Sequence, residues 1–167
     1  MMSRLLEMLM TSGAIKKGEF VLSSGKKSSI YVDIKQAVTD PVILDRIGEE
    51  MAKKLENVEF DRIACIELGG VPIAVALSLR ISKPLIIFRK AKKDYGVQED
   101  RIGKIENGDR VVVVEDVVTT GKSAKSVVER VEKSGGKVVA VVAVVDREES
   151  DIKPVSLLKL SEILKNS

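Results

Sequence analysis

Short runs of valine, isoleucine and leucine alternate with segments of helical pattern, and this order restricts the possible folds more than any other feature. The apolar runs predict buried strands and occupy residues 61–68, 83–90, 109–116 and 137–150. Two intervening segments, 69–80 and 119–136, each begin at a glycine-containing turn and predict helices. Strands that alternate with helices predict an α/β fold, with a central, mostly parallel sheet flanked by helices on both faces.

The first forty residues predict a small subdomain, or hood, beside this sheet. Residues 3–12 have the apolar spacing of a short helix, and residues 18–37 indicate two short strands around a Ser/Gly/Lys turn. Asp40 and Pro41 favour the start of a helix that runs to about Leu55. The polar segment 91–108 predicts a long mobile loop. We expect one domain over 1–167, divided into a hood (about 1–40), a core (about 41–150) and a short tail (151–167) that forms a strand and a helical turn.

The composition excludes several kinds of chemistry. The 167 residues include no histidine, which rules out imidazole acid–base catalysis and histidine-bound metals. The single cysteine, Cys65, lies in an apolar run and indicates a small buried hydrophobe rather than a nucleophile. A net charge of +3, from 28 basic and 25 acidic residues, argues against a nucleic-acid-binding coat. No apolar run approaches membrane-spanning length and the N-terminus lacks a signal-peptide pattern, so we expect a soluble, cytoplasmic protein.

The segment VVVVEDVVTTGKS, residues 111–123, carries the strongest functional signal. The turn Thr119-Thr120-Gly121 enters a helix at Lys122, and backbone N–H groups at a helix start favour a phosphate. The adjacent Glu115 and Asp116 would repel a phosphate, but carboxylates accept hydrogen bonds from sugar hydroxyls. The combination predicts a site for a phosphorylated sugar; the alternative is an ordinary helix start with two solvated acids. A nucleotide-hydrolase loop is excluded, because its first glycine would fall at position 116.

Five segments together resemble the type I phosphoribosyltransferase family, and in particular its orotate-specific members. VVVVEDVVTTGKS resembles the family's phosphoribosyl-pyrophosphate motif. GEFVLSSGKKSSIYVDIK (18–35) resembles its base-binding segment, and ELGGVPIA (67–74) resembles its pyrophosphate loop. RKAKKDYG (89–96) resembles its catalytic loop, and VVDREE (144–149) resembles a late strand end. The match runs nearly end to end in the family's order. It implies the type I phosphoribosyltransferase fold, in which the N-terminal hood binds the base.

The resemblance implies roles for residues that meet the donor, 5-phosphoribosyl 1-pyrophosphate (PRPP). Glu115 and Asp116 would hold the ribose 2- and 3-hydroxyls as catalytic residues. The next residues would complete the PRPP site and wrap its 5-phosphate: Val117, Val118, Thr119, Thr120, Gly121, Lys122 and Ser123. The pyrophosphate would meet the backbone amides of Glu67, Leu68, Gly69 and Gly70. It would also meet the loop residues Arg89, Lys90, Lys93 and Tyr95, of which Lys93 would be catalytic.

At the base end, the resemblance implies that Arg147 pairs with the orotate carboxylate and that Tyr31, Val32 and Thr119 line the pocket. The residues alone leave simpler readings open. These are a surface ion pair of Arg147 with Glu148 or Glu149, ordinary strand packing of Tyr31 and Val32, and a solvated basic patch over 89–93. Two departures from the family pattern fall on the expected pyrophosphate contacts. Tyr95 replaces a common histidine of the loop, and Gly69 stands where some members carry a lysine.

These roles imply transfer of ribose 5-phosphate from PRPP to N1 of orotate, which gives orotidine 5′-monophosphate and pyrophosphate in pyrimidine synthesis. Mg²⁺ would arrive with the pyrophosphate and be held mainly by substrate and water, with no direct protein ligand. The family's shared site implies a homodimer whose mobile loop reaches the neighbouring active site, with no nucleic-acid or membrane partner. Two alternatives stay open: a purine phosphoribosyltransferase, and a non-catalytic regulator that binds PRPP or a nucleotide.

Overall fold

The structure is a computed structural model that describes residues 1–90 and 100–166 and contains two β-sheets. Strands β1 (Ile15–Val21) and β2 (Lys27–Val32) form an antiparallel hairpin. The central sheet contains β3 (Arg62–Ile66), β4 (Leu85–Phe88), β5 (Arg101–Ile102), β6 (Arg110–Val118), β7 (Lys137–Asp146) and β8 (Val155–Lys159). The helices are α1 (Arg4–Thr11), α2 (Ile34–Ala37), α3 (Pro41–Lys54), α4 (Val71–Ile81), α5 (Lys122–Lys133) and α6 (Leu160–Lys165). In this described part of the chain, no helix has the length and apolar character that crossing a membrane requires.

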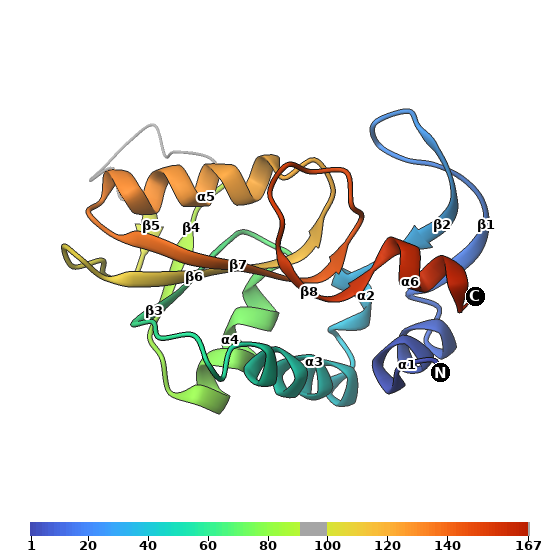
Figure 1. Cartoon of the computed structure of the whole chain (residues 1–167), viewed down its shortest axis with the longest axis horizontal. Helices are drawn as coiled ribbons and strands as arrows, with labels where there is room; N and C mark the ends of the chain where they lie inside the picture. Colours follow the sequence, from blue (N-terminus) through green and yellow to red (C-terminus); the bar gives the residue numbers. More distant parts are fainter. Residues whose placement is uncertain (91–99, 167) are drawn as a thin grey trace.

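The central sheet is parallel except at one edge. Its order is β5-β4-β3-β6-β7-β8, and within the described ranges only β5 runs antiparallel to its neighbour. Helix α5 covers one face of the sheet, whereas α3 and α4 cover the opposite face (Figure 1). The predicted α/β fold, with a mostly parallel sheet between helices, is therefore confirmed. The carboxyl ends of the parallel strands lie along one edge, which is where ligands bind in sheets of this kind.

The valine run of β6 is buried because both faces of the strand are covered. Val112 and Val114 belong to the larger apolar cluster, which includes side chains of α1, α3 and α4. Val111 and Val113 belong to a smaller cluster that includes side chains of α5. Neighbouring residues of a strand point to opposite faces of the sheet, and a strand covered on both faces reads as a continuous apolar run. The two residues that follow these valines, Glu115 and Asp116, continue the same alternation.

The hood packs against one end of the core. Leu5, Leu6 and Leu9 of α1 and Ile30 of β2 belong to the larger apolar cluster. Figure 1 places α1, the β1–β2 hairpin and α6 together at one end of the molecule. The chain then enters α3 as predicted, because the Asp40 carboxylate accepts a hydrogen bond from Val42 N (2.8 Å). The hood is therefore joined to the core by shared apolar packing.

Three boundaries differ from the prediction because tertiary contacts extend or create short elements. Residues 91–99 lie outside the described part, but the end of the predicted 91–108 loop contains β5, which pairs with β4. Strand β6 continues to Val118, because its pairing with β7 extends to Asp146. Glu115 and Asp116 lie within the predicted strand, 109–116, and Val117 and Val118 extend it. Helix α2 was not predicted; its four residues follow Asp33, whose carboxylate caps the helix by accepting a hydrogen bond from Gln36 N (3.1 Å).

Candidate active site

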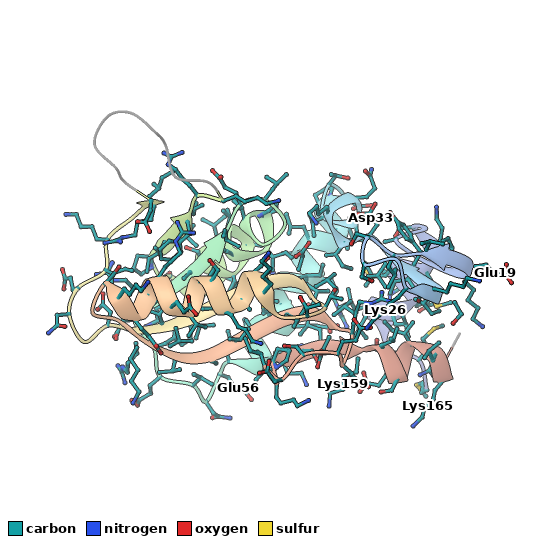
Figure 2. The ribbon with its side chains drawn as sticks, turned by 90° about the horizontal axis from the view of Figure 1, so that it is seen from above. Glu19, Lys26, Asp33, Glu56, Lys159 and Lys165 are labelled. Carbon is teal, nitrogen blue, oxygen red and sulfur yellow. The ribbon has the colours of Figure 1, made fainter. Side chains whose placement is uncertain are left out.

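The predicted site segments meet at the sheet edge where β3, β4, β6 and β7 end. Residues 67–70 follow β3, residues 89–90 follow β4, residues 119–123 follow β6, and Arg147 follows β7. Because these strands are parallel, their carboxyl ends bring the four segments together. The hood reaches the same edge through Lys35, which pairs with Asp116, and Ser28, which bonds to Arg147. Asp33, which precedes α2, lies beside the hairpin in Figure 2.

The turn between β6 and α5 presents free backbone N–H groups. Gly121 is the N-terminal cap of this 12-residue helix, and no side chain caps it. No described residue accepts a hydrogen bond from the N–H groups of residues 119–124. The turn and Glu115 line a cavity of about 140 Å³. Free N–H groups at the start of a helix attract an anion, so the turn has the chemistry of a phosphate site.

Gly121 is required in this turn for two reasons. Its φ angle of 83° lies in the left-handed region, which other residues rarely adopt. A Cβ atom at this position would also overlap the side chain of Ser150. Ser150 is buried and its Oγ accepts a hydrogen bond from Ile152 N (3.0 Å), which holds it in place. Any larger residue at position 121 would therefore distort the turn.

Glu115 is a buried acid without a described partner. Its side chain is 5% exposed, and its Oε1 has no hydrogen-bond partner among the described residues. Burial raises the pKa of Glu115 to about 7, the charge of Asp116 adds to the rise, and Lys35 opposes it. Because it lines the cavity in front of α5, Glu115 faces the phosphate turn. Its carboxyl group therefore changes protonation state near neutral pH.

Asp116 has different surroundings from its neighbour in sequence. Its Oδ2 lies 3.3 Å from the Nζ of Lys35 in α2. Gly69 lies against the same carboxylate, because a Cβ atom at position 69 would overlap it. Asp116 is therefore held between the hood and the turn that precedes α4, whereas Glu115 lies beside the α5 turn. The two acids occupy opposite sides of β6, as the alternation along a strand requires.

Residues 67–70 form a tight turn with free donors. Gly70 is needed there because a Cβ atom would lie 2.7 Å from the carbonyl oxygen of Val114. The N–H groups of residues 68–70 donate to no described residue, and the peptide bond between Glu67 and Leu68 is cis. The Glu67 carboxylate accepts a hydrogen bond from Lys90 N (3.1 Å), which ties this turn to the end of β4. The turn thus offers free backbone donors to an anion.

The basic residues after β4 are only partly described. Arg89 is half-buried, its Nε has no described partner, and Lys90 is exposed. Predicted site residues Lys93 and Tyr95 lie outside the described residues. Arg130 of α5 supports the chain on both sides of that gap, since its guanidinium donates to Arg89 O (2.9 Å) and Asp100 O (2.8 Å). Arg89 and Lys90 therefore lie next to residues 67–70, on a backbone that Arg130 and Glu67 hold by hydrogen bonds.

Arg147, at the end of the site that the resemblance assigns to the base, is 6% exposed. Its Nη2 donates a hydrogen bond to Ser28 Oγ (3.1 Å), and its Nε has no described partner. The ion pair considered from sequence is not formed, because Glu148 accepts a hydrogen bond from Ser161 Oγ (2.6 Å) and Glu149 pairs with Lys26 (3.9 Å). A buried guanidinium with a free donor has the chemistry to bind a carboxylate.

The other predicted base-site residues lie on β2 and in the β6–α5 turn. Tyr31 is 38% exposed, and its ring centroid lies 5.4 Å from that of Phe20. Its hydroxyl donates a hydrogen bond to Asp33 Oδ2 (3.4 Å). Val32 is half-buried and packs on the larger apolar cluster, and Thr119 is half-buried. Tyr31 and Val32 thus make the strand contacts that the simpler reading expects, at the hairpin end of the site.

Three residues of the site were not singled out from sequence: Ser28, Lys35 and Arg130. Ser28 and Lys35 lie in the segment 18–35 that carried the family resemblance, but nothing in their spacing indicates a contact with Arg147 or Asp116. Arg130 lies in the last turn of α5, where a basic residue normally indicates a solvated helix end. Its contact with two carbonyl groups depends on the packing of α5 beside β4 and β5. Only the folded chain brings these partners together.

The fold and the edge site together define a class of enzyme. A model of the family described as "Phosphoribosyl transferase domain" matches residues 35–164. The match covers α2 to α6 and includes every segment of the site except the hairpin. The chain is thus a glycosyltransferase that contains a phosphoribosyltransferase domain.

Comparison with individual relatives identifies the kind of phosphoribosyltransferase. It is 62% identical to an orotate phosphoribosyltransferase of Archaeoglobus fulgidus over 96% of this chain and 90% of the relative. Its fold matches the crystal structure of an orotate phosphoribosyltransferase from Aeropyrum pernix with a TM-score of 0.84 and 32% identity, over 97% of both chains. It also matches part of a Leishmania donovani UMP synthase (TM-score 0.83, 33% identity), with 96% of this chain but only 37% of that chain covered. The chain therefore belongs to the orotate phosphoribosyltransferases of the type I phosphoribosyltransferase family.

Proposed function

We propose that this chain transfers ribose 5-phosphate from PRPP to N1 of orotate and releases orotidine 5′-monophosphate and pyrophosphate. One observation carries the proposal: three complementary groups meet at one sheet edge. The free N–H groups of residues 119–124 fit a phosphate, the Asp116 carboxylate fits sugar hydroxyls, and the buried Arg147 guanidinium fits a carboxylate on the base. The reaction serves pyrimidine nucleotide synthesis. We assign it to the cytoplasm, where the lone thiol of Cys65 stays reduced.

The proposed mechanism depends on positioning and charge rather than on a covalent nucleophile. The turn at 119–123 holds the 5-phosphate and Asp116 holds the ribose hydroxyls, so that C1 is presented between residues 67–70 and the base site. Fixing both reactants in this way removes much of the entropic barrier to their encounter. The electron pair of the C1–O bond leaves with pyrophosphate as N1 of orotate bonds to C1. The predicted share of Glu115 in holding the hydroxyls is part of the proposal.

The departing pyrophosphate carries several negative charges and needs cations. Among the described residues, no group of three or more His, Cys, Asp or Glu side chains is placed to hold a metal ion. This donor set fits an ion carried mainly by pyrophosphate oxygens and water, which Mg²⁺ prefers. Bound Mg²⁺ would neutralise part of the pyrophosphate charge. The protein's own contribution would come from Arg89, Lys90 and the predicted catalytic residue Lys93.

The base end selects orotate through its carboxylate. Arg147 presents a planar set of donors, and a guanidinium binds a carboxylate through two parallel hydrogen bonds. Ser28 holds one end of the guanidinium and leaves Nε free for the ligand. Tyr31, Val32 and Thr119 would line the rest of the pocket. Adenine and guanine lack a carboxylate, so they would leave this buried charge without a counter-ion.

The proposal includes a homodimer formed through α3 and α4. A groove of about 670 Å³ runs between these helices, and its lining includes exposed apolar side chains of α4, among them Val75 (38% exposed) and Leu79 (80% exposed). An exposed apolar surface of this kind favours a protein interface. Because α4 begins directly after residues 67–70, a second copy bound there would lie beside the active site. The predicted loop with Lys93 would then be able to reach the neighbouring site.

The dimer is tested by placing a charge in the groove. Leu79→Glu would put a carboxylate into an apolar contact, so we expect it to give monomers in sedimentation equilibrium and to lower activity at least about tenfold. Val155→Glu, on the edge strand β8, is the matched control and should stay dimeric. A fully active monomer would contradict the shared site.

The reaction itself is tested by following the loss of orotate absorbance when purified protein is mixed with PRPP. We expect rapid loss that requires both PRPP and Mg²⁺, and no comparable reaction of adenine, guanine or uracil. Reaction of a purine in place of orotate would favour a purine phosphoribosyltransferase. Binding of PRPP without reaction of any base would favour a regulator instead.

A further inference from the structure

Lys35 lies inside the site although no motif assigns it a role. Helix α2 is anchored by Ile34 (2% exposed) and Ala37 (4% exposed), which are part of the larger apolar cluster. Asp33 caps the helix, so the side chain between these anchors is directed outward. Lys35 is 62% exposed, and its ammonium group reaches the Asp116 carboxylate at 3.3 Å. The packing of α2 against the core thus places the solvent-accessible ammonium group of Lys35 beside the buried Asp116 carboxylate.

The turn at 67–70 lacks a cation of its own. Its sequence is Glu-Leu-Gly-Gly, and Gly69 stands where some family members carry a lysine. A Cβ atom at position 69 would overlap the Asp116 carboxylate, so a larger residue there would require that carboxylate to move. Lys35 approaches that same carboxylate from the hood. Lys35 and Gly69 therefore lie against the same carboxylate, so α2 places a cation next to a turn that has none.

The ammonium group has donors to spare for a ligand. A lysine ammonium carries three N–H donors, and the described contacts of Lys35 use it only toward Asp116. If Asp116 holds the ribose hydroxyls, its partner lies close to C1, because the 2-hydroxyl is on the adjacent carbon. Lys35 also lowers the pKa of Glu115, so its charge acts across the whole ribose end of the site.

We propose that Lys35 is a substrate-binding residue that contacts the pyrophosphate group of PRPP and of the product. The inference rests on the proposed function for the identity of the ligand. In the free protein Lys35 is the counter-ion of Asp116; in the complex its remaining donors bind pyrophosphate oxygens next to the bond that breaks. A purely structural Lys35 would do no more than neutralise Asp116.

The two roles are separated by two ligands that share only part of the site. Inorganic pyrophosphate with Mg²⁺ meets the pyrophosphate region, whereas ribose 5-phosphate meets the 119–123 turn and Asp116. For Lys35→Met we expect pyrophosphate to bind about 10–100-fold more weakly, the usual loss for one charge-assisted contact, while ribose 5-phosphate changes less than about twofold. The KM for PRPP should rise with the pyrophosphate dissociation constant, and the KM for orotate should stay within about twofold.

Two further variants test whether a loss of affinity depends on the charge and the position of Lys35. Lys35→Arg keeps the charge and should recover most of the pyrophosphate affinity. Lys53→Met removes an equally exposed lysine that pairs with Glu49 on α3, and should leave both ligands unaffected. Unchanged pyrophosphate binding by Lys35→Met would overturn the proposal. Equal weakening of both ligands, or a change confined to ribose 5-phosphate, would also overturn it in favour of the structural role. Calorimetric titration measures all these affinities.

The experiment also separates this inference from the proposed function. Wild-type protein is assayed first for orotate consumption. If orotate is not consumed but pyrophosphate still binds in a manner that depends on Lys35, the transferase proposal fails and the binding role of Lys35 stands. If orotate is consumed and Lys35→Met binds pyrophosphate like wild type, the function stands and the role of Lys35 fails.

Discussion

The sugar-phosphate end of the site lies within one stretch, residues 115–124, whereas the base end joins Ser28 of the hairpin to Arg147, 119 positions away. The first end uses the start of a helix and a strand end, so its donors are mostly backbone groups. The second uses side chains that meet only because the hood packs over the end of β7. Backbone donors bind a phosphate whatever the attached base, and side-chain donors choose among bases. In the proposed function, the first end binds the common donor and the second determines selectivity.

The largest effect is expected from Asp116→Asn at the sugar-phosphate end. The amide removes the charge that receives the ribose hydroxyls, and we expect kcat/KM for PRPP to fall about 10²–10³-fold. Steady-state kinetics with both substrates varied measures this. Asp61→Asn, which alters an acid paired with Arg110 at the opposite end of β3, is the control and should have wild-type kinetics. A variant impaired only in its KM for orotate would break the division between the two ends.

The next largest effect concerns Glu115 and the pH dependence of stability. Burial raises its folded-state pKa from the usual 4.5 to about 7. Between these values the unfolded chain releases its proton first, so the contribution of Glu115 to stability is full below about pH 4.5 and is lost as pH rises to about 7. The loss is about 3 kcal/mol. Glu115→Gln removes this titration, so its free energy of unfolding relative to wild type should rise by about that amount between pH 4.5 and pH 8.

Urea unfolding at the two pH values measures the Glu115 effect. Glu56→Gln is the matched control, because Glu56 is exposed and lies far from the hairpin end of the molecule (Figure 2). It should have the same relative stability at both pH values. If the stability of Glu115→Gln relative to wild type were also the same at both pH values, the buried acid would be stabilised in its charged form. The contrast between Glu115 and Asp116 would then be lost.

A smaller effect is expected from Arg147→Lys at the base end. Lysine keeps the charge but lacks the planar fork, so we expect the KM for orotate to rise about thirtyfold while the KM for PRPP changes less than about twofold. Initial rates at saturating PRPP measure the change. Equal increases in both KM values would show that Arg147 supports the whole site, and the proposed selectivity role would be wrong.

The smallest effect is expected from Ser28→Ala, which removes the hydroxyl that holds Arg147. One such hydrogen bond contributes about 1 kcal/mol, so the KM for orotate should rise about fivefold. Ser24→Ala in the same hairpin is the control, because among the described residues its Oγ accepts a hydrogen bond only from Lys26 N within the turn. If Ser28→Ala and Arg147→Lys are combined, the effects should be less than additive, since both act on the same guanidinium. Full additivity would argue that Ser28 does not orient Arg147.

The sequence by itself determined the alternation of strands and helices, the α3 start at Asp40 and the presence of a phosphate-type turn at 119–121. These features depend on local periodicity, capping and φ preferences, which act between residues close in sequence. Tertiary structure decided that β6 continues to Val118, and that Lys35 and Ser28 face Asp116 and Arg147. It also decided that one of two adjacent acids is buried without a described partner and the other is paired. Such differences arise from desolvation and from contacts between distant segments, and neither is encoded in a residue's immediate neighbours.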